Sequence, residues 1–355
     1  MKINFADNLK RLRICRGYSR AALAERLAYS VKSVEKWERG NVLPPMAVVC
    51  RLSDIFQVTV DQLLYRDHVN IRYLLGVDGG GTKTEFLLTD RDRREVKRLA
   101  LGPSNPVDVG MASCKAILEE GILRVCEGIS LREVSAFMGL AGGMTGNNCE
   151  IIGDFLSGFC FGACQNGGDV ETALELACGD EDGAVVIIGT GIVAYAQTKG
   201  KRCRVGGWGY LIDQGGSGFN FGAQAIDSAL KNVDGRGGSR KIREWIERQT
   251  GQPIDQIISD IYKKGKSYVA SFAPAVFEAY RQGDDCARQI VERNVKELAA
   301  IIRVVQTDKP VVLCGGLCAY ADILQAFLPQ ELAVIFMGAS MVEGAVALAK
   351  KNAED

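Results

Sequence analysis

The stretch that most constrains the fold is residues 74–90, with the sequence LLGVDGGGTKTEFLLTD. An apolar run ends in Asp78, three glycines follow, and a second apolar run begins after Thr82, Lys83 and Thr84. This pattern predicts a β-hairpin with a glycine-rich turn. Because glycine tolerates positive φ and carries no side chain, the backbone N–H groups of residues 79–82 can approach and hold a phosphate. Asp78, at the strand end, can hold Mg²⁺ through water, since this ion prefers oxygen ligands and keeps several waters.

This stretch fits neither of two common phosphate-binding motifs. The P-loop needs adjacent Gly and Lys, and the spacing GxGxxG is also absent from residues 74–90. A tight hairpin without a ligand is therefore the alternative interpretation, and the decision between the two depends on the residues that follow.

Histidine and cysteine usage limits the possible chemistry. The chain of 355 residues has one histidine, His68, which argues against His-ligated metals and Ser–His–Asp triads. Its twelve cysteines form no CxxC pair, and the closest pairs are CxxxC, at residues 160/164 and 314/318. In a reducing cytosol such cysteines act mostly as small hydrophobic residues. We therefore expect any catalysis to use carboxylates, backbone amides and Mg²⁺. No apolar run reaches the ~18 residues of a membrane span, so we expect a soluble, cytoplasmic protein without a membrane partner.

Charge is unevenly distributed along the chain. The net charge is zero, but residues 1–66 hold twelve Lys and Arg against six Asp and Glu. The rest of the chain is correspondingly acidic. Such asymmetry indicates a basic module that meets nucleic acid, attached to a larger domain of another kind.

The basic segment, residues 1–66, predicts a small helical domain. Helices are expected at Phe5–Cys15, Arg20–Leu27, Val31–Arg39, after Pro45 through Ile55, and at Val58–Tyr65. Ser19 and Ser30 are plausible N-caps of the second and third helices. The short connection at residues 28–30 gives these two helices the spacing of a helix-turn-helix.

Two parts of this segment, SRAALAERLAYSVKSVEKWERGNVLPP and LSDIFQVTVDQLL, resemble the Cro/cI (XRE-type) DNA-binding family. The resemblance implies a DNA operator as partner and a phosphate contact for Arg20. It also implies that five residues of the third helix face base edges or backbone: Ser30, Val31, Lys32, Ser33 and Lys36. Glu35 departs from the pattern because a carboxylate repels phosphate, although it can accept from cytosine N4. A helical domain for protein contacts is the alternative.

After a linker at residues 67–71, apolar strands that end in glycine-rich turns recur. They end at Asp78, at Gly189 and at Gly315. Two β-rich segments begin near residues 72 and 184, which predicts one supersecondary unit used twice. We expect a two-lobed α/β domain over residues 72–355. Its first lobe would span about 72–165 plus a C-terminal helix at 340–351, and its second lobe about 166–339.

This order of elements resembles the actin-like/sugar-kinase ATPase fold and, within it, the BadF/BadG/BcrA/BcrD ATPase family with its N-acetylglucosamine kinases. The matching motifs are GVDGGGTKTE, GPSNP, GLAGG, IIGTG, GGWGYLI, GSG and LCGG. The resemblance implies Mg-ATP between the lobes, bound by Asp78, Gly79, Gly80, Gly81, Thr82, Lys83, Gly189, Thr190, Gly191, Gly315 and Gly316. It implies an amino sugar bound by Asn105, Gly143, Thr190 and Gln214. The expected fold class is an all-α helix-turn-helix domain followed by an α/β two-lobed actin-like/sugar-kinase ATPase domain.

The sequence departs from these kinases at the positions that carry catalysis. After the GLAGG turn the kinases place an aspartate, the base that accepts the sugar hydroxyl proton. Here this residue is Met144, which cannot accept a proton. Gln214 replaces an aspartate that contacts the sugar, and a glutamine can still hydrogen-bond a hydroxyl. Asp213, displaced by one position, is a candidate substitute base. Its alternative role is that of a solvated loop acid.

Three functional hypotheses follow. The first is a transcription regulator, working as a homodimer, whose C-terminal domain senses an amino sugar or sugar phosphate, with ATP, and has weak or no kinase activity. The second is an active N-acetylglucosamine (N-acetylhexosamine) kinase that carries a DNA-binding domain. The third, an activator of a radical dehydratase, is disfavoured because neither CxxxC pair sits where a bridging iron–sulfur cluster would need it. We favour the regulator, because it explains both the basic N-terminus and the missing carboxylate.

Overall fold

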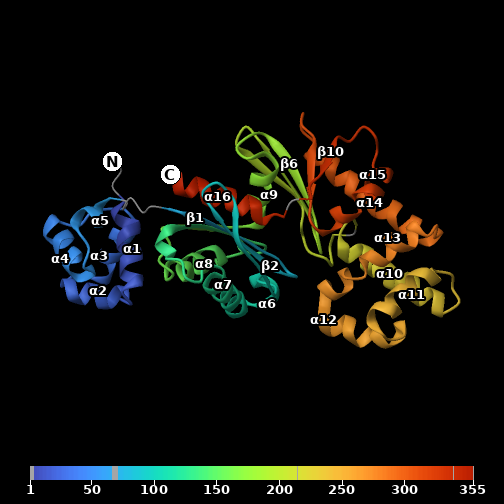
Figure 1. Cartoon of the computed structure of the whole chain (residues 1–355), viewed down its shortest axis with the longest axis horizontal. Helices are drawn as coiled ribbons and strands as arrows, with labels where there is room; N and C mark the ends of the chain where they lie inside the picture. The colour runs from blue at the N-terminus through green and yellow to red at the C-terminus, as the bar shows by residue number, and fades with distance from the viewer. Residues whose placement is uncertain (1–3, 66–70, 214, 339, 355) are drawn as a thin grey trace.

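A computed structural model describes residues 4–65, 71–213, 215–338 and 340–354. Two residues discussed above, His68 and Gln214, lie outside this described part. An N-terminal domain of five helices is followed by two sheets of five strands each, with helices packed around both (Figure 1). The predicted fold class, a helix-turn-helix domain joined to an actin-like sugar-kinase fold, is confirmed. No helix in the described ranges is long and apolar enough to span a membrane.

The N-terminal helices lie close to where the sequence placed them. They are α1 (Phe5–Cys15), α2 (Arg20–Leu27), α3 (Val31–Glu38), α4 (Met46–Phe56) and α5 (Val60–Leu64). Both serine caps are present: the side chain of Ser19 accepts from the backbone N–H of Ala22, and that of Ser30 accepts from Ser33. Their apolar faces form one core, which includes the buried side chains of Phe5, Phe56, Trp37, Leu9 and Leu23.

The two sheets repeat one topology. The first contains β1 (Tyr73–Gly79), β2 (Thr84–Asp90), β3 (Glu95–Leu101), β4 (Val134–Leu140) and β5 (Ala163–Gly167), in the order β3-β2-β1-β4-β5. The second contains β6 (Gly183–Ile188), β7 (Ile192–Thr198), β8 (Lys201–Gly206), β9 (Val311–Cys314) and β10 (Val334–Phe336), in the order β10-β9-β6-β7-β8. In each, three antiparallel strands are extended by two parallel strands. The predicted use of one unit twice is therefore confirmed.

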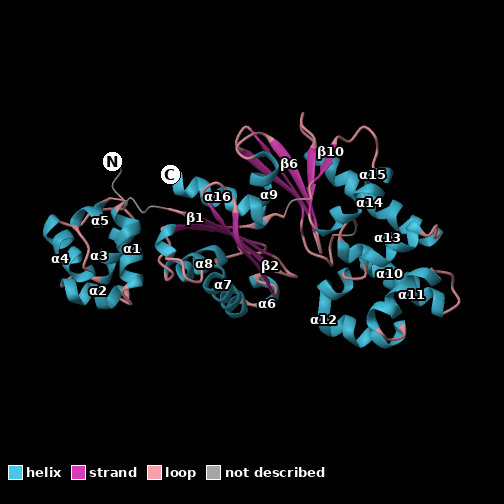
Figure 2. Cartoon of the chain, in the orientation of Figure 1, coloured by secondary structure: helices cyan, strands magenta, loops and turns pink. Residues whose placement is uncertain are grey.

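Helices cover both sheets (Figure 2). Those following the first three strands are α6 (Pro106–Val109), α7 (Met111–Val125), α8 (Asn148–Ser157) and α9 (Asp169–Cys178), with a 3₁₀ turn at Leu131–Glu133. Those after β8 are α10 (Gly218–Val233), α11 (Arg240–Thr250), α12 (Ile258–Ala270), α13 (Ala273–Arg281), α14 (Asp285–Val305), α15 (Ala321–Phe327) and α16 (Val342–Glu354), with 3₁₀ turns at Ile254–Ile257 and Gly316–Tyr320.

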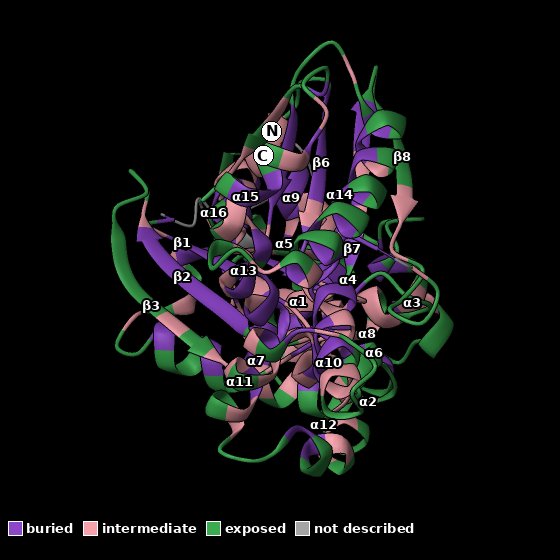
Figure 3. Cartoon of the chain, turned by 90° about the vertical axis from the view of Figure 1, so that its right-hand side faces the viewer, coloured by how far each residue is buried: buried purple, intermediate pink, exposed green. Residues whose placement is uncertain are grey.

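Helices α9 and α16 lie between the two sheets (Figure 1). Close packing here depends on small residues: a Cβ on Gly76 of β1 would lie 2.6 Å from the carbonyl oxygen of Val342 in α16. The strands beneath the helices are largely buried (Figure 3). The C-terminal helix therefore completes the first lobe, although it follows the second lobe in the sequence.

The N-terminal domain sits beside the first lobe, at the side where β5 forms the sheet edge (Figure 1). Lys10 of α1 pairs with Asp154 of α8, with 2.8 Å between Nζ and Oδ1. Three strands, β5, β8 and β10, were not predicted. They are edge or near-edge strands with polar or short sequences, so they lack the apolar run that marks β1, β4, β6 and β9.

Candidate active site and nucleic-acid interface

Backbone hydrogen bonds fix the glycine turn that follows β1. The carbonyl of Gly79 accepts from the N–H of Ala141 (2.8 Å), and the carbonyl of Gly80 accepts from Ser104 (3.1 Å) and Asn105 (3.2 Å). Ala141 belongs to the GLAGG turn after β4, and Ser104 and Asn105 belong to the GPSNP loop after β3. Three motifs that are separate in the sequence thus meet at one end of the first sheet.

Space, rather than unusual backbone conformation, explains the glycines in this turn. The positive φ that the sequence suggested is not found at residues 79–81. A Cβ on Gly79 would lie 2.3 Å from the hydroxyl oxygen of Ser104, and one on Gly81 would lie 2.9 Å from a carboxylate oxygen of Asp108. Glycine is therefore needed because neighbouring loops approach the turn closely.

The corresponding turn of the second sheet faces the first. The hydroxyl oxygens of Thr82 and Thr190 lie 3.1 Å apart, so the two predicted phosphate-binding turns touch. The carbonyls of Gly189 and Thr190 accept from the first N–H groups of α10, at 2.8 and 3.1 Å. A Cβ on Gly189 or Gly191 would meet nothing within 4 Å, so the side of the turn that a ligand would approach is open.

The third predicted turn lies next to the second. Gly315 has a φ of 109°, and a Cβ there would lie 2.8 Å from the carbonyl oxygen of Ile188 at the end of β6. Gly316 meets no such obstacle. The geometry thus brings the turns at Asp78, Gly189 and Gly315 to the region where the lobes meet, while their contacts with a nucleotide stay a prediction.

Two buried carboxylates lie at this point, and the charge of Asp169 acts on Asp78. Burial, and then the charges of Asp169 and Glu85, raise the pKa of Asp78 to about 7. Burial, followed by the charge of Glu171, also raises the pKa of Asp169, which opens α9. The nearest cation in sequence, Lys83, is engaged elsewhere: its Nζ donates to Glu85 at 2.9 Å.

These two acids fit a divalent cation better than a protein cation. Carboxylate oxygens are the ligands Mg²⁺ prefers, and a bound cation would offset the cost of burying their charges. Within the described ranges, no group of three or more His, Cys, Asp or Glu is arranged to hold a metal. An ion at Asp78 would therefore take its remaining ligands from water and phosphate oxygens, as the sequence suggested for this residue.

Two of the expected sugar-binding residues, Asn105 and Gly143, lie around the GLAGG turn, while Thr190 lies on the turn after β6. The side-chain oxygen of Asn105 caps α6 by accepting from the N–H of Val107 (2.9 Å). A Cβ on Gly142 would lie 2.3 Å from that same oxygen, and one on Gly143 would lie 3.1 Å from the carbonyl oxygen of Gly167. Asn105 and Gly143 are therefore close to one another. Gln214 lies outside the described residues.

The two positions considered for the base differ in environment. Met144 is 55% exposed, and its Cγ lies 3.3 Å from where a Cβ on Gly168 would be, so it borders the residue before Asp169. The carboxylate of Asp213 accepts from the N–H of Gly209 (3.1 Å), and its backbone carbonyl accepts from Asn220 (3.1 Å). Asp213 thus stabilises the loop between β8 and α10 in which it lies. Its part in catalysis stays a prediction.

Sequence reasoning missed Asp169 as a site residue. It follows the NGG sequence at the end of β5, and β5 was not recognised because its five residues carry no apolar run. The available signal was an acid next to a glycine pair, although at Asp78 the acid precedes the glycines and at Asp169 it follows them.

The surface of α3 carries the predicted DNA contacts. Val31, Lys32 and Lys36 are exposed and Ser33 is partly exposed, while Ser30 caps the helix. Glu35 pairs with Arg39 at 2.5 Å, so its charge is offset on the surface. Arg20 donates to the buried Glu38 at 2.7 Å, yet its side chain remains 43% exposed and can still reach a phosphate.

Comparison with known proteins agrees with this architecture. The model of the BadF/BadG/BcrA/BcrD ATPase family matches residues 75–345, and a helix-turn-helix domain model matches residues 4–64. An N-acetylmuramic acid/N-acetylglucosamine kinase of Clostridium acetobutylicum is 31% identical over 260 residues, which cover 69% of this chain and 85% of that protein.

Solved structures show the same fold. A proposed N-acetylglucosamine kinase of Chromobacterium violaceum has 27% identity and a TM-score of 0.67, over 79% of this chain and 99% of that one. A ROK family glucokinase of Streptomyces griseus, solved with glucose and AMPPNP, has 15% identity and a TM-score of 0.53, over 80% of this chain and 100% of that one. The latter likeness concerns the fold alone.

Replacing Asp78 tests the electrostatics of the site. With a pKa raised from 3.8 to about 7, the folded chain keeps a proton that the unfolded chain loses. Its unfolding free energy should therefore fall as pH rises between these values. Asp78→Asn removes the buried charge, and should be more stable than the unaltered chain at pH 8, by up to about 4 kcal/mol, but similar at pH 4.

Thermal midpoints measured from pH 4 to pH 8 would show this difference. Asp92→Asn, which alters a 73% exposed acid, is the matched control and should follow the unaltered chain. Addition of Mg²⁺ should reduce the difference in thermal midpoint between Asp78→Asn and the unaltered chain. Parallel curves for Asp78→Asn and the unaltered chain would contradict the assignment of a buried, uncompensated charge.

Proposed function

This chain belongs to the BadF/BadG/BcrA/BcrD ATPase family, and on that premise we propose that it is a DNA-binding transcription regulator that senses an amino sugar. Its helix-turn-helix domain would bind an operator, and its ATPase domain would bind the sugar or its phosphate together with Mg-ATP. Kinase activity would be weak or absent, because Met144 occupies the position expected for the base. We place this function in the cytoplasm and in a homodimer.

The observation that carries the proposal is the position of α8. At its start, the side chain of Asn148 donates to the carbonyl of Gly142, in the GLAGG turn (3.0 Å). Toward its end, Asp154 pairs with Lys10 of the helix-turn-helix domain. The helix has 10 residues, and so spans about 15 Å. One rigid element therefore touches both the expected sugar site and the DNA-binding domain.

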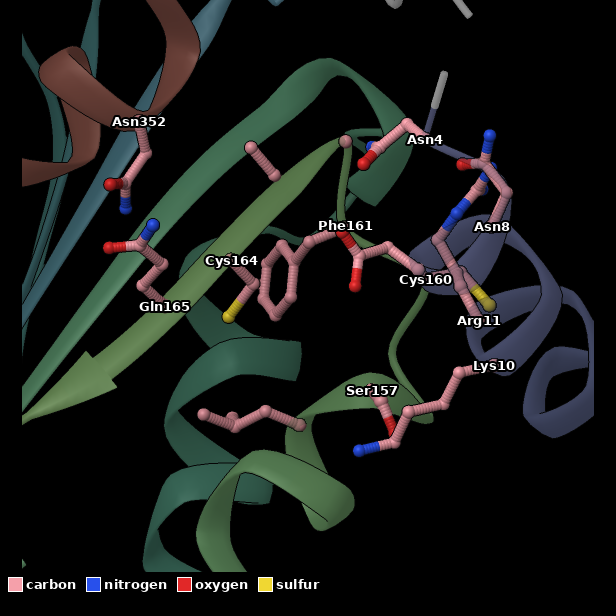
Figure 4. Close-up of a pocket in the computed structure, with 14 residues that line it drawn as sticks. Asn4, Asn8, Lys10, Arg11, Ser157, Cys160, Phe161, Cys164, Gln165 and Asn352 are labelled. Atoms are coloured by element: carbon pink, nitrogen blue, oxygen red, sulfur yellow. The ribbon is translucent and has the colours of Figure 1, made fainter. Parts of the chain in front are cut away.

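The interface between the N-terminal domain and the first lobe is polar and contains a cavity. A pocket of about 410 Å³ separates them, lined on one side by Lys10 and Arg11 and on the other by Ser157 and Gln165 (Figure 4). Lys10 and Asp154 are 34% and 54% exposed, and pairs of this kind contribute roughly 0–1 kcal/mol. A small displacement of α8 is therefore enough to shift how the domain sits.

Such a shift matters if two helix-turn-helix domains bind together. Half-sites of this class lie about one helical turn, ~34 Å, apart on the duplex. A dimer whose two α3 helices change their separation would lose simultaneous docking. Couplings between ligand sites are typically 1–3 kcal/mol, about 5- to 150-fold in affinity, and a contact worth roughly 0–1 kcal/mol would supply the lower end of this range.

Asp169 supports a second candidate, an active N-acetylhexosamine kinase with a DNA-binding domain. Its carboxylate is buried close enough to Asp78 to raise the pKa of that residue. It also follows Gly168, which Met144 contacts. A carboxylate is therefore available near the position of the missing base. Bound Mg-ATP would supply the phosphoryl group, and Asp169 would have to accept the proton of the sugar hydroxyl.

Exchanging the charges at the α1–α8 contact tests the sensor. In the unaltered chain, operator affinity should change with N-acetylglucosamine and Mg-ATP. Lys10→Glu and Asp154→Lys should each reduce that change at least threefold, since like charges then separate α1 from α8. The double variant should restore it. Fluorescence anisotropy measures operator affinity with and without sugar. The ratio of these two affinities is compared between variants, because direct effects of charge on DNA binding cancel in it.

Two outcomes would count against this proposal. Single variants that respond to sugar as the unaltered chain does would remove α8 from the coupling. An unaltered chain whose operator affinity ignores every amino sugar and sugar phosphate would contradict the sensor role itself.

The α3 surface generates a separate prediction for DNA binding. Lys32→Ala combined with Lys36→Ala should weaken operator binding roughly tenfold or more and lower the slope of log affinity against log salt by up to about 2. Lys199→Ala with Lys201→Ala, exposed lysines of the second lobe, removes the same charge and is the control. Unchanged binding by the α3 variant would exclude α3 as the DNA-facing helix.

Enzyme assays distinguish regulator from kinase. ADP release with N-acetylglucosamine and Mg-ATP should be near background, and Met144→Asp should raise it, because a general base contributes roughly 10²–10⁴-fold. Asp169→Asn should remove any residual rate if that carboxylate acts as the base. Turnover by the unaltered chain at about 1–100 s⁻¹, ordinary for kinases, would overturn the regulator without kinase activity and favour the second candidate.

A further inference from the structure

Helix α12 of the second lobe reaches the glycine turn of the first. The helix is interrupted at Gly265, where φ is 69° and ψ is −156°, a conformation open essentially only to glycine. The next two residues contact the first lobe: Lys266 Nζ lies 2.7 Å from Asp108 Oδ1, and the hydroxyl of Ser267 donates to the carbonyl of Gly81 (3.1 Å). The interruption therefore directs Lys266 across the boundary between the lobes.

Lys266 lies directly over the turn expected to hold phosphates. A Cβ on Gly81 would be 3.7 Å from its Cε and 3.9 Å from its Nζ. Its side chain is 27% exposed, so the ammonium is partly withdrawn from water. The centroid of the Tyr210 ring lies 5.9 Å from the Lys266 Nζ. The ammonium could thus meet a phosphate on this turn without a large movement of the backbone.

Another cation near this site is Lys83, which the family resemblance also assigns to the nucleotide. Lys83, within the turn, is bound to Glu85 and is 63% exposed. Glu85 also holds Arg98, at 2.5 Å. Asp108, the present partner of Lys266, is an anion beside Gly81 and would repel a phosphate there. A phosphate on the turn would therefore compete with Asp108 for the Lys266 ammonium.

We infer that Lys266 is a phosphate-binding residue, which exchanges Asp108 for the terminal phosphate of a nucleoside triphosphate on the Gly79–Thr82 turn. This inference rests on the proposed nucleotide site and names a residue that closes it from the second lobe. In the chain without nucleotide, Asp108 holds the ammonium in place. The exchange also releases Asp108, a residue of α6, from the second lobe. Because Asn105 caps α6, phosphate binding would in this way affect the position of the expected sugar contact.

Calorimetric titration with ADP and with the non-hydrolysable triphosphate AMPPNP, both with Mg²⁺, tests the inference. Lys266→Met should weaken AMPPNP binding roughly 10- to 100-fold, as expected for a lost charge-assisted hydrogen bond, and ADP binding much less. Lys266→Arg should retain most of the affinity. Lys264→Met is the matched control, because Lys264 lies on the same helix and pairs within it, with Asp260 at 2.9 Å. It should behave as the unaltered chain.

Asp108→Asn separates a phosphate ligand from a simple tie between lobes. It removes the competing anion, so AMPPNP should bind severalfold more tightly. If Lys266 only tied the lobes together, Asp108→Asn and Lys266→Met would instead shift affinity in the same direction, and the inference would be overturned. Failure of the unaltered chain to bind either nucleotide would overturn the proposed nucleotide site, and this inference with it.

Discussion

Hydrogen bonds that the carbonyls of Gly79 and Gly80 accept hold the end of β1 against two other loops. Each carbonyl accepts from a backbone N–H in a different motif, the GLAGG turn for Gly79 and the GPSNP loop for Gly80. Backbone bonds of this kind do not depend on side-chain identity, and buried peptide groups must find partners. They therefore place Asp78, Asn105 and Gly143 together whatever side chain follows the GLAGG turn. The geometry of the site would be kept whether or not residue 144 can act as a base.

The acids of the site explain why a ligand would matter to this chain. Asp78 and Asp169 are buried, and burial raises the pKa of both carboxyl groups. Burial of charge costs free energy unless it is compensated. A ligand that brings a divalent cation offsets this cost, and does so only when the lobes are arranged to hold it. The same electrostatics serves a sensor or a kinase, and what separates the two is whether a base reaches the sugar hydroxyl.

Residue patterns predicted most of the fold because apolar runs and caps mark its elements locally. The helices from α1 to α5, the β1–β2 hairpin and the repeated unit could all be predicted from spacing. β5 could not, because the sequence ACQNG carries no apolar alternation and pairs only through its backbone. Missing β5 meant missing Asp169, which derives its position from that strand. Lys266 could not be predicted as a site residue either. It is 185 positions from Gly81 in the sequence, and only the packing of α12 against the first lobe brings the two together. Packing of the two lobes, unlike local structure, has no short-range signature.

The position of the N-terminal domain beside β5 has a consequence for how this protein can be divided. β5 is the outermost strand of its sheet, and its residues Ala163, Cys164 and Gln165 share a pocket with Asn4 and Asn8. An outermost strand presents unpaired peptide groups that can recruit another chain. The helix-turn-helix domain shields this border. An ATPase domain produced alone would therefore expose to solvent the part of this border that now lines the pocket.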